Sequence, residues 1–274
     1  KKVLMVLSIV ILGSLGALLL AGCGGSKQSS APAENKQTQQ KPKYTVAMEA
    51  SFAPFEFRDE KTGELKGFDV DLMNAIAKAE GFDVDYKDMG FDGIIASVQT
   101  GSVDMAISGI SITDKRKEQV DFSLPYYMSG LAIAVSKDNN TIKSIKDLEG
   151  KRIAVQIATT GADYAAKIPG AKITTFDHVT EALMEIKNGG ADALINDYPV
   201  SYYYIKMNGN KDFKILKERI TSEPYGIIVK KGNTKLLNMI NDGLLKLKKS
   251  GEYAKIYKKW FDEEPPAYLP GEPK

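Results

Sequence analysis

The chain has 274 residues, and 37 Lys and Arg residues against 35 Asp and Glu residues give a formal charge of +2 at pH 7. Lys1 and Lys2 supply this excess and the remainder is formally neutral, which argues against the basic face of a nucleic-acid-binding protein. The sequence contains no P-loop, no GxGxxG after a strand, no HExxH and no CxxC, so we expect no metal and no other cofactor.

The first segment is an uncharged apolar run from Val3 to Gly22, ending in Leu20-Ala21-Gly22-Cys23. Small uncharged residues before a cysteine, here the only cysteine, resemble the lipobox of bacterial lipoprotein precursors, and the two leading lysines match the positive start of such a signal. The resemblance implies a signal peptide over residues 1–22, lipidation of Cys23, and a lipid anchor on the extracytoplasmic face of the cell membrane. A transmembrane helix is the alternative, because the run is long enough to span a bilayer. Glycines crowd its second half, however, and no Lys or Arg cluster follows it.

The next segment is polar. Residues 24–43 contain no aromatic residue and no Leu, Ile or Val, so they cannot bury enough surface to fold. We therefore expect residues 23–43 to form a lipidated, disordered tether that spaces a folded domain from the membrane.

Strand and helix patterns alternate through the first part of the folded region. Val70, Leu72, Met73, Ile76 and Ala77 share one face of a predicted helix. A β-α-β alternation predicts a mostly parallel sheet with helices on both faces. The expected elements are strands at 44–48, 82–86 and 103–108 and helices at 70–79 and 91–100.

The same alternation begins again after residue 150, which predicts two α/β lobes. The stretches 127–135 and 221–229 lie between the two sets of elements. The pattern at 234–260 predicts a long helix with a break at Gly251. The other expected elements are strands at 151–156, 171–176, 193–195, 213–217 and 226–230 and helices at 161–168, 179–188 and 198–207.

Five sequence blocks resemble the polar amino-acid branch of the bacterial extracellular solute-binding proteins, and they follow the order and spacing of that family. Together they cover essentially the whole folded region. The blocks are Phe52-Ala53-Pro54-Phe55-Glu56-Phe57, Gly67-Phe68-Asp69-Val70-Asp71-Leu72, Ser108-Gly109-Ile110-Ser111-Ile112-Thr113-Asp114-Lys115-Arg116, Val120-Asp121-Phe122-Ser123 and Asn196-Asp197.

The resemblance implies an α/β protein with the type II periplasmic-binding-protein-like fold, in which a two-strand hinge joins two α/β lobes. It places lobe 1 at residues 44–130 and 224–274 and lobe 2 at residues 131–223. It further implies a monomeric substrate-binding component of an amino-acid ABC importer. Such a protein closes on one free L-amino acid, needs no cofactor, and delivers the ligand to a membrane permease.

A closed site must neutralise the α-carboxylate and the α-ammonium of the ligand, because an unpaired buried charge is costly. Arg116 offers a planar, permanently charged fork that suits a carboxylate. The alternatives are a surface arginine, a plain N-cap at Thr159-Thr160-Gly161, and an N-cap at Asp197. The resemblance assigns the carboxylate to Arg116, Ser111 and Thr160 and the ammonium to Asp197, Gly109 and Ser111.

The resemblance also supplies a pocket for the ligand side chain. Glutamine-binding relatives carry a lysine where this chain has neutral Gln156, and some basic-amino-acid binders carry a longer polar residue in place of Gly161, which predicts a wider pocket. Aromatic faces attract cations, although core packing is the alternative for each phenylalanine. The residues assigned to this pocket are Glu49, Phe52, Phe91, Ser108, Gln156 and Gly161.

Charge counting then favours a basic ligand. Arg116 balances the ligand carboxylate and Asp197 its ammonium, which leaves Glu49 without an evident basic neighbour. Arginine, lysine, ornithine or histidine would balance Glu49; glutamine is the second choice, and acidic ligands are repelled. His178, the only histidine, is expected at the exposed start of a helix.

Other functions on the same fold are a dehydratase, a sensory domain and a lipoprotein adhesin. An enzyme would need an acid–base group over its substrate, and Glu49 is the only plausible candidate. We therefore expect a binding protein with no catalytic residues rather than an enzyme.

Overall fold

The computed structural model describes residues 41–209 and 211–272, and these belong to one structural unit. The predictions for residues 1–22, Cys23 and most of the tether lie outside the described residues. Among the described residues, no helix combines the length and apolar content that a membrane crossing requires.

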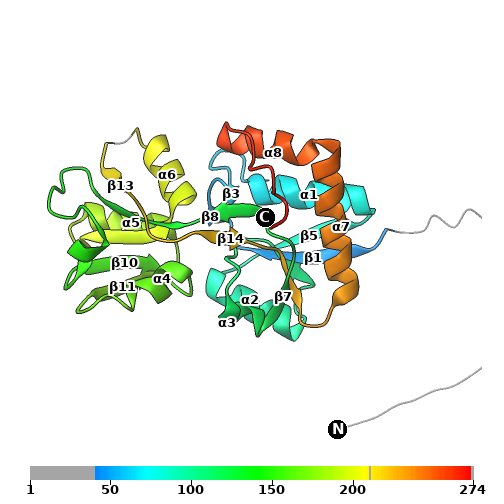
Figure 1. Cartoon of the computed structure of the whole chain (residues 1–274), viewed down its shortest axis with the longest axis horizontal. Coiled ribbons are helices and arrows are strands. Elements are labelled where there is room, and N and C mark those ends of the chain that lie inside the picture. The colour runs from blue at the N-terminus through cyan, green and yellow to red at the C-terminus, as the bar shows by residue number, and fades with distance from the viewer. Residues whose placement is uncertain (1–40, 210, 273–274) are drawn as a thin grey trace, which may run out of the picture. The chain divides into compact units, whose positions relative to one another are not determined.

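Lobe 1 is built on a five-stranded sheet in the order β5-β1-β6-β15-β7 (Figure 1). Strands β5, β1 and β6 run parallel, whereas β15 is antiparallel to β6 and β7, so the expected parallel arrangement holds for part of the sheet only. The strands are β1 (Lys43–Met48), β5 (Asp83–Asp88), β6 (Met105–Ala106), β7 (Val120–Phe122) and β15 (Ile228–Lys230). The helices are α1 (Phe68–Glu80), α2 (Phe91–Thr100), α3 (Asp114–Lys117), α7 (Thr234–Ser250) and α8 (Glu252–Phe261).

Lobe 2 contains a second five-stranded sheet in the order β11-β10-β12-β9-β13. Its first three strands are parallel, and β9 runs antiparallel to both β12 and β13. The strands are β9 (Leu131–Ser136), β10 (Arg152–Gln156), β11 (Lys172–Phe176), β12 (Ala193–Asp197) and β13 (Phe213–Arg219). The helices are the 3-10 helix η1 (Ile145–Leu148), α4 (Thr160–Ala165), α5 (Val179–Lys187) and α6 (Tyr198–Met207).

Two strands connect the lobes. β8 (Tyr127–Ser129) and β14 (Glu223–Tyr225) form an antiparallel pair that runs between the two sheets (Figure 1). A Cβ atom on Gly130 would lie 2.1 Å from the carbonyl oxygen of Thr221, so a glycine is needed where the two crossings touch. Two α/β lobes and a two-strand hinge confirm the expected fold class.

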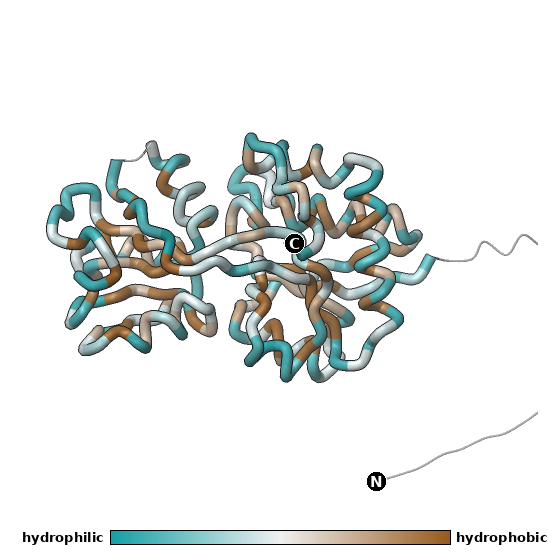
Figure 2. Tube along the Cα trace, viewed as in Figure 1, coloured by the Kyte–Doolittle hydropathy of each residue, from teal (hydrophilic) through white to brown (hydrophobic). Residues whose placement is uncertain are grey.

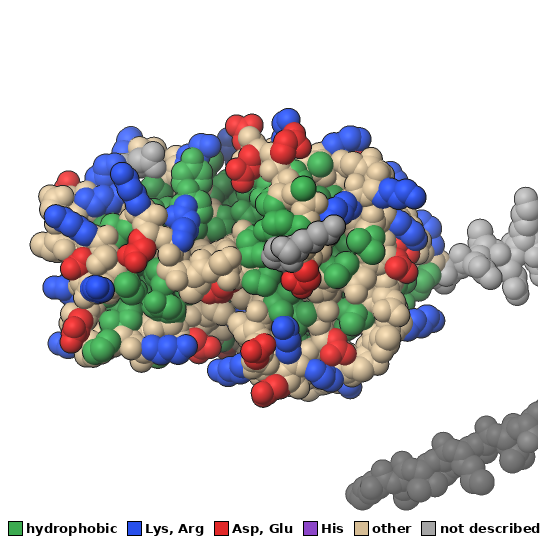
Figure 3. All heavy atoms as spheres, in the orientation of Figure 1, with side chains coloured by type: hydrophobic (Ala, Val, Ile, Leu, Met, Phe, Trp, Pro, Cys, Tyr) green, Lys and Arg blue, Asp and Glu red, His purple; other side chains and the backbone are tan. Residues whose placement is uncertain are grey.

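The core of each lobe lies between its sheet and the helices that cover it. Ile76 of α1 packs with Ile240 and Leu244 of α7, and all three are fully buried. Figure 2 shows the hydrophobic residues concentrated along the strands and the inner helix faces. In the view of Figure 3, acidic and basic side chains are interspersed over the surface, in keeping with the balanced charge.

The sequence did not predict a small three-stranded sheet that follows β1. It is formed by β2 (Ser51–Phe52), β3 (Glu56–Arg58) and β4 (Leu65–Lys66). The strand expected at 103–108 is also shorter than predicted, because only Met105 and Ala106 of β6 pair with the neighbouring strands.

Candidate functional site

The predicted site residues gather where strands from the two lobes end. Asp197 is the last residue of β12, Gln156 is the last residue of β10, and Glu49 directly follows β1. Ligands bind beyond the carboxyl ends of strands in open α/β sheets. Nine residues line a small cavity here: Phe52, Phe91, Gly109, Ser111, Arg116, Gln156, Thr159, Thr160 and Asp197.

Eight of these nine residues were predicted from the sequence, and Thr159 was not. The cavity has a volume of about 10 Å³, which is room for about one water molecule. Glu49, Ser108 and Gly161 were also predicted but lie outside its lining. Residues 41–209 and 211–272 contain no cluster of His, Cys, Asp and Glu that could hold a metal ion.

Arg116 reaches the cavity from the short helix α3, whose N-cap Thr113 accepts a hydrogen bond from the Arg116 backbone N–H. Its guanidinium donates to the carbonyl oxygen of Ser111 at 2.9 Å and, across the lobes, to that of Ala158 at 3.1 Å. It also lies 5.5 Å from the centre of the Phe91 ring. The residue is 7% exposed, which excludes the surface-arginine alternative.

The charge of Arg116 is poorly compensated. Burial lowers the pKa of its guanidinium, and the carboxylates of Asp197 and Glu223 only partly oppose this effect. Neither carboxylate forms an ion pair with it within the described residues, and its hydrogen bonds go to neutral backbone carbonyls. A buried cation of this kind favours binding of an anion, because an uncompensated buried charge is costly.

Asp197 provides a buried anion on the opposite lobe. It is 4% exposed, and its Oδ1 accepts hydrogen bonds from the hydroxyls of Ser129 and Tyr225. Its side chain makes no capping hydrogen bond to α6, so the N-cap alternative does not account for it. Burial, reinforced by the negative charge of Glu223, raises the pKa of Asp197 to about 6.

The Thr159-Thr160-Gly161 segment opens α4. Thr159 is the N-cap and accepts a hydrogen bond from the Ala162 N–H, whereas the Thr160 hydroxyl donates to Glu223 at 2.7 Å. Gly161, assigned from the sequence to the side-chain pocket, is not among the residues that line the cavity. A Cβ atom there would lie 2.7 Å from the carbonyl oxygen of Ile195 on β12, so its small size serves packing between α4 and the sheet.

Ser108 lies behind the cavity instead of in it. The residue is 1% exposed, its hydroxyl donates to Glu56 at 2.6 Å, and it accepts from the Glu49 backbone N–H at 3.0 Å. Because these partners occupy the hydroxyl, Ser108 holds β1 and β3 together and does not contact the cavity.

Behind this loop lie two fully buried carboxyl groups, which sequence analysis did not assign to the site. Asp69 accepts hydrogen bonds from the Gly109 N–H at 2.9 Å and the Tyr126 hydroxyl at 2.8 Å. Burial raises the pKa of Asp69 to about 6 and, together with the negative charge of Asp69, raises that of Glu56 well above its ordinary value. The hydrogen bond from the Gly109 N–H to Asp69 therefore fixes the Gly109 end of the cavity.

Glu49 is buried, with 3% of its side chain exposed, and it has a basic neighbour. The Nδ1 atom of His178 lies 2.8 Å from Glu49 Oε1, and the Gln156 amide donates to Glu49 Oε2 at 3.2 Å. The Ser51 hydroxyl also donates to Oε1. The expectation that no basic residue lies beside Glu49 is wrong, because sequence distance hid the contact between the end of β1 and the N-cap of α5.

The chain matches a known protein family over most of its length. Residues 44–263 match the family described as bacterial extracellular solute-binding proteins, family 3. The chain belongs to this family. A probable histidine-binding protein of Neisseria gonorrhoeae is 40% identical over 254 residues, covering 90% of this chain and 92% of the relative. The ABC transporter glutamine-binding protein GlnH of Bacillus subtilis is 32% identical over 271 residues, covering 95% and 98%.

Solved structures give the same result for the fold. An ancestral arginine-binding protein bound to arginine superimposes with a TM-score of 0.78 and 47% identity, over 81% of this chain and 99% of that one. These relatives are named for binding and not for catalysis.

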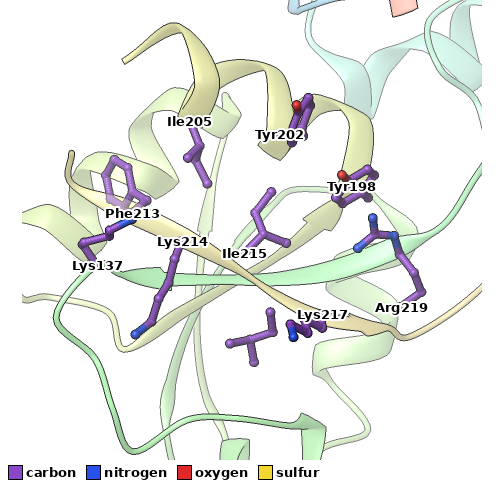
Figure 4. A pocket seen from close by; sticks show the side chains of 10 residues that line it. Lys137, Tyr198, Tyr202, Ile205, Phe213, Lys214, Ile215, Lys217 and Arg219 are labelled. Carbon is purple, nitrogen blue, oxygen red and sulfur yellow. The ribbon is translucent and has the colours of Figure 1, made fainter. Parts of the chain in front are cut away.

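A different hollow of about 450 Å³ lies on lobe 2 between α6 and β13 (Figure 4). Lys137, Lys214, Lys217 and Arg219 border it, and the Arg219 guanidinium stacks 3.0 Å over the Tyr198 ring. It contains none of the predicted site residues and no carboxylate that could bind an ammonium group. We therefore place the candidate site in the cavity between the lobes.

Proposed function

We propose that this chain is the substrate-binding component of an amino-acid ABC importer and binds one L-amino acid between its lobes. The single observation that carries the proposal is the buried, poorly compensated guanidinium of Arg116, which faces the same cavity as the buried carboxylate of Asp197. An α-carboxylate would pair with Arg116 and an α-ammonium with Asp197, so one ligand neutralises both groups. The names of the relatives support this proposal.

For the ligand side chain we propose a basic amino acid, with arginine, lysine and histidine as the candidates. Gln156 lines the cavity, is 1% exposed, and its Oε1 atom has no hydrogen-bond partner within the described residues. Such an acceptor favours a ligand side chain that donates hydrogen bonds. Glu49 lies directly behind it and favours a cation, while an acidic side chain would be repelled.

Glutamine is the second candidate. Its amide can donate to Gln156 Oε1 without adding charge, and His178 already provides a partner for Glu49. The relative from Bacillus subtilis named for glutamine supports this alternative.

Ligand binding on this proposal requires the lobes to move. A cavity of about 10 Å³ cannot hold an amino acid. Contacts between the lobes, such as Arg116 with Ala158 and Gln156 with Glu49, must open to admit one. The paired strands β8 and β14 are the natural hinge, since they connect the sheets with few residues.

We also propose lipidation of Cys23 and anchoring on the extracytoplasmic side of the membrane. The support is the Leu20-Ala21-Gly22-Cys23 motif after an uncharged run, followed by a polar segment.

A thermal-shift screen of the twenty amino acids, followed by titration calorimetry, tests the ligand. Arginine or lysine should stabilise the fold most, by about 4 kcal/mol at a thousand-fold excess over the dissociation constant. Glu49→Gln should reduce or reverse the preference of the protein for arginine or lysine over glutamine. A wild-type protein that prefers glutamine in direct competition contradicts the basic-ligand proposal, and one that binds no amino acid contradicts the whole assignment.

A further inference from the structure

Lobe 2 presents its histidine to the buried carboxylate of lobe 1. His178 is the N-cap of α5, and its Nδ1 atom lies 2.8 Å from Glu49 Oε1 and 2.9 Å from the Ser51 hydroxyl oxygen. The His178 side chain is 43% exposed, whereas that of Glu49 is 3% exposed. The imidazole therefore lies between solvent and a carboxylate that is otherwise enclosed.

The other ionisable groups around this contact are acidic or phenolic. On α5 itself, Glu181 accepts a hydrogen bond from the His178 backbone N–H at 3.1 Å, and Asp177 directly precedes the helix cap. Behind Glu49, the buried Glu56 of β3 interacts with it electrostatically. From α6, the Tyr204 hydroxyl donates to the Ser51 carbonyl.

Within residues 41–209 and 211–272, His178 is the one basic side chain in contact with Glu49. Among the residues that the structure describes, the one ion pair that includes Glu49 is the pair with His178. The net charge of this pair therefore depends on whether His178 carries a proton. With His178 protonated the pair is neutral, and with His178 neutral the pocket carries one negative charge.

We propose that His178 is a specificity-determining residue that competes with a cationic ligand side chain for Glu49, so that its protonation decides between a basic and a neutral ligand. The inference rests on the proposed function. A guanidinium or ammonium group entering the pocket meets a net negative charge only when His178 is neutral, because two cations beside one carboxylate repel each other. Gln156 lines the cavity and donates a hydrogen bond to Glu49, so it connects the ligand site with the Glu49 carboxylate.

The competition couples binding to proton exchange. Histidine side chains change charge between pH 5 and 8. Arginine binding should expel the proton of His178, so arginine affinity rises with pH over this range, whereas glutamine binding retains the proton. Asp197 also titrates here, since burial raises its pKa to about 6. Both ligands carry the α-ammonium that pairs with Asp197, however, so the ratio of the two dissociation constants cancels its effect.

The experiment is titration calorimetry of the purified chain with arginine and with glutamine at several pH values between about 5 and 8. The preference for arginine over glutamine, measured as the ratio of the two dissociation constants, should rise about tenfold across this range. Buffers of different ionisation enthalpy should show proton release with arginine alone. His178→Gln should keep a constant preference for arginine, and His178→Lys, which fixes the positive charge, should lower that preference at every pH.

The slope with pH and the sign of the preference are separate readouts. A wild-type preference that does not change with pH, or one that changes equally in His178→Gln, overturns the role of His178. A preference for glutamine near the upper end of the range contradicts the basic-ligand proposal, whatever the slope. Melting curves show whether the variants fold. If His178→Gln is unstable, His178→Asn replaces it as the variant with an uncharged side chain, because asparagine is a favourable N-cap residue.

Discussion

Asp197→Asn should stabilise the chain in the absence of ligand and abolish ligand binding. Burial raises the pKa of Asp197 to about 6, from an ordinary value of 3.8. Because the folded state holds this proton more tightly than the unfolded state, stability falls as the pH rises from about 4 to 6. Two pKa units correspond to about 3 kcal/mol, and the full cost applies above pH 6. Asparagine is uncharged and keeps an oxygen for Ser129 and Tyr225, so it removes this cost.

At about pH 7.5 the gain of about 3 kcal/mol should raise the melting temperature by roughly 6–12 °C, since 1 kcal/mol corresponds to about 2–4 °C in a domain of this size. At about pH 4 the gain should fall below about 1 kcal/mol, because aspartic acid is then protonated in the folded state.

The assay is thermal unfolding followed by circular dichroism at both pH values, with and without amino acids. Asp163→Asn is the matched control, because the Asp163 side chain is 62% exposed and its ion pair with Lys115 is long, at 3.7 Å. This variant should change stability little. The reasoning fails if Asp197→Asn is no more stable than the wild type at the higher pH, or if its gain is the same at both.

Three further predictions concern the ligand clamp, the hinge and the anchor. Arg116→Ala should weaken amino-acid binding at least ~100-fold, because the ligand carboxylate would be buried unpaired; near-native affinity by calorimetry would remove Arg116 from the site. Ligand should reduce the radius of gyration in small-angle scattering, and identical profiles at saturation would argue against hinge closure. Cys23→Ala should block processing and lipid labelling in a bacterial host, while labelling that persists would show that Cys23 is not the anchor.

The order of elements was predictable because each helix and strand carries its own local signal. α2 and α6 have the predicted bounds, and the long C-terminal helix breaks at Gly251 as expected, since this glycine adopts a left-handed conformation with φ of 77°. The antiparallel strands β15 and β9 were not predictable, because strand direction depends on partners far away in the sequence.

The candidate site also contains some features that were predictable from the sequence and others that were not. Arg116 and Asp197 could be assigned to the site from the sequence, because both lie in blocks that have the order and spacing of the family. The contact between Glu49 and His178 could not be found in this way, since it joins residues 129 positions apart in two lobes. The contacts of Ser108 and Gly161 were not predictable, because a hydroxyl turned toward Glu56, or a missing Cβ beside Ile195, leaves no trace in a local pattern.

The three residues around the side-chain pocket come from three separate elements: Glu49 from the end of β1, Gln156 from the end of β10 and His178 from the N-cap of α5. All three are polar, and none belongs to the hydrophobic clusters of the two lobes. The groups that would hold the α-carbon are fixed separately by α3 and β12. Evolution could therefore redirect such a protein from one nutrient to another through a few substitutions, and the same three positions are the first targets for engineering amino-acid biosensors on this scaffold.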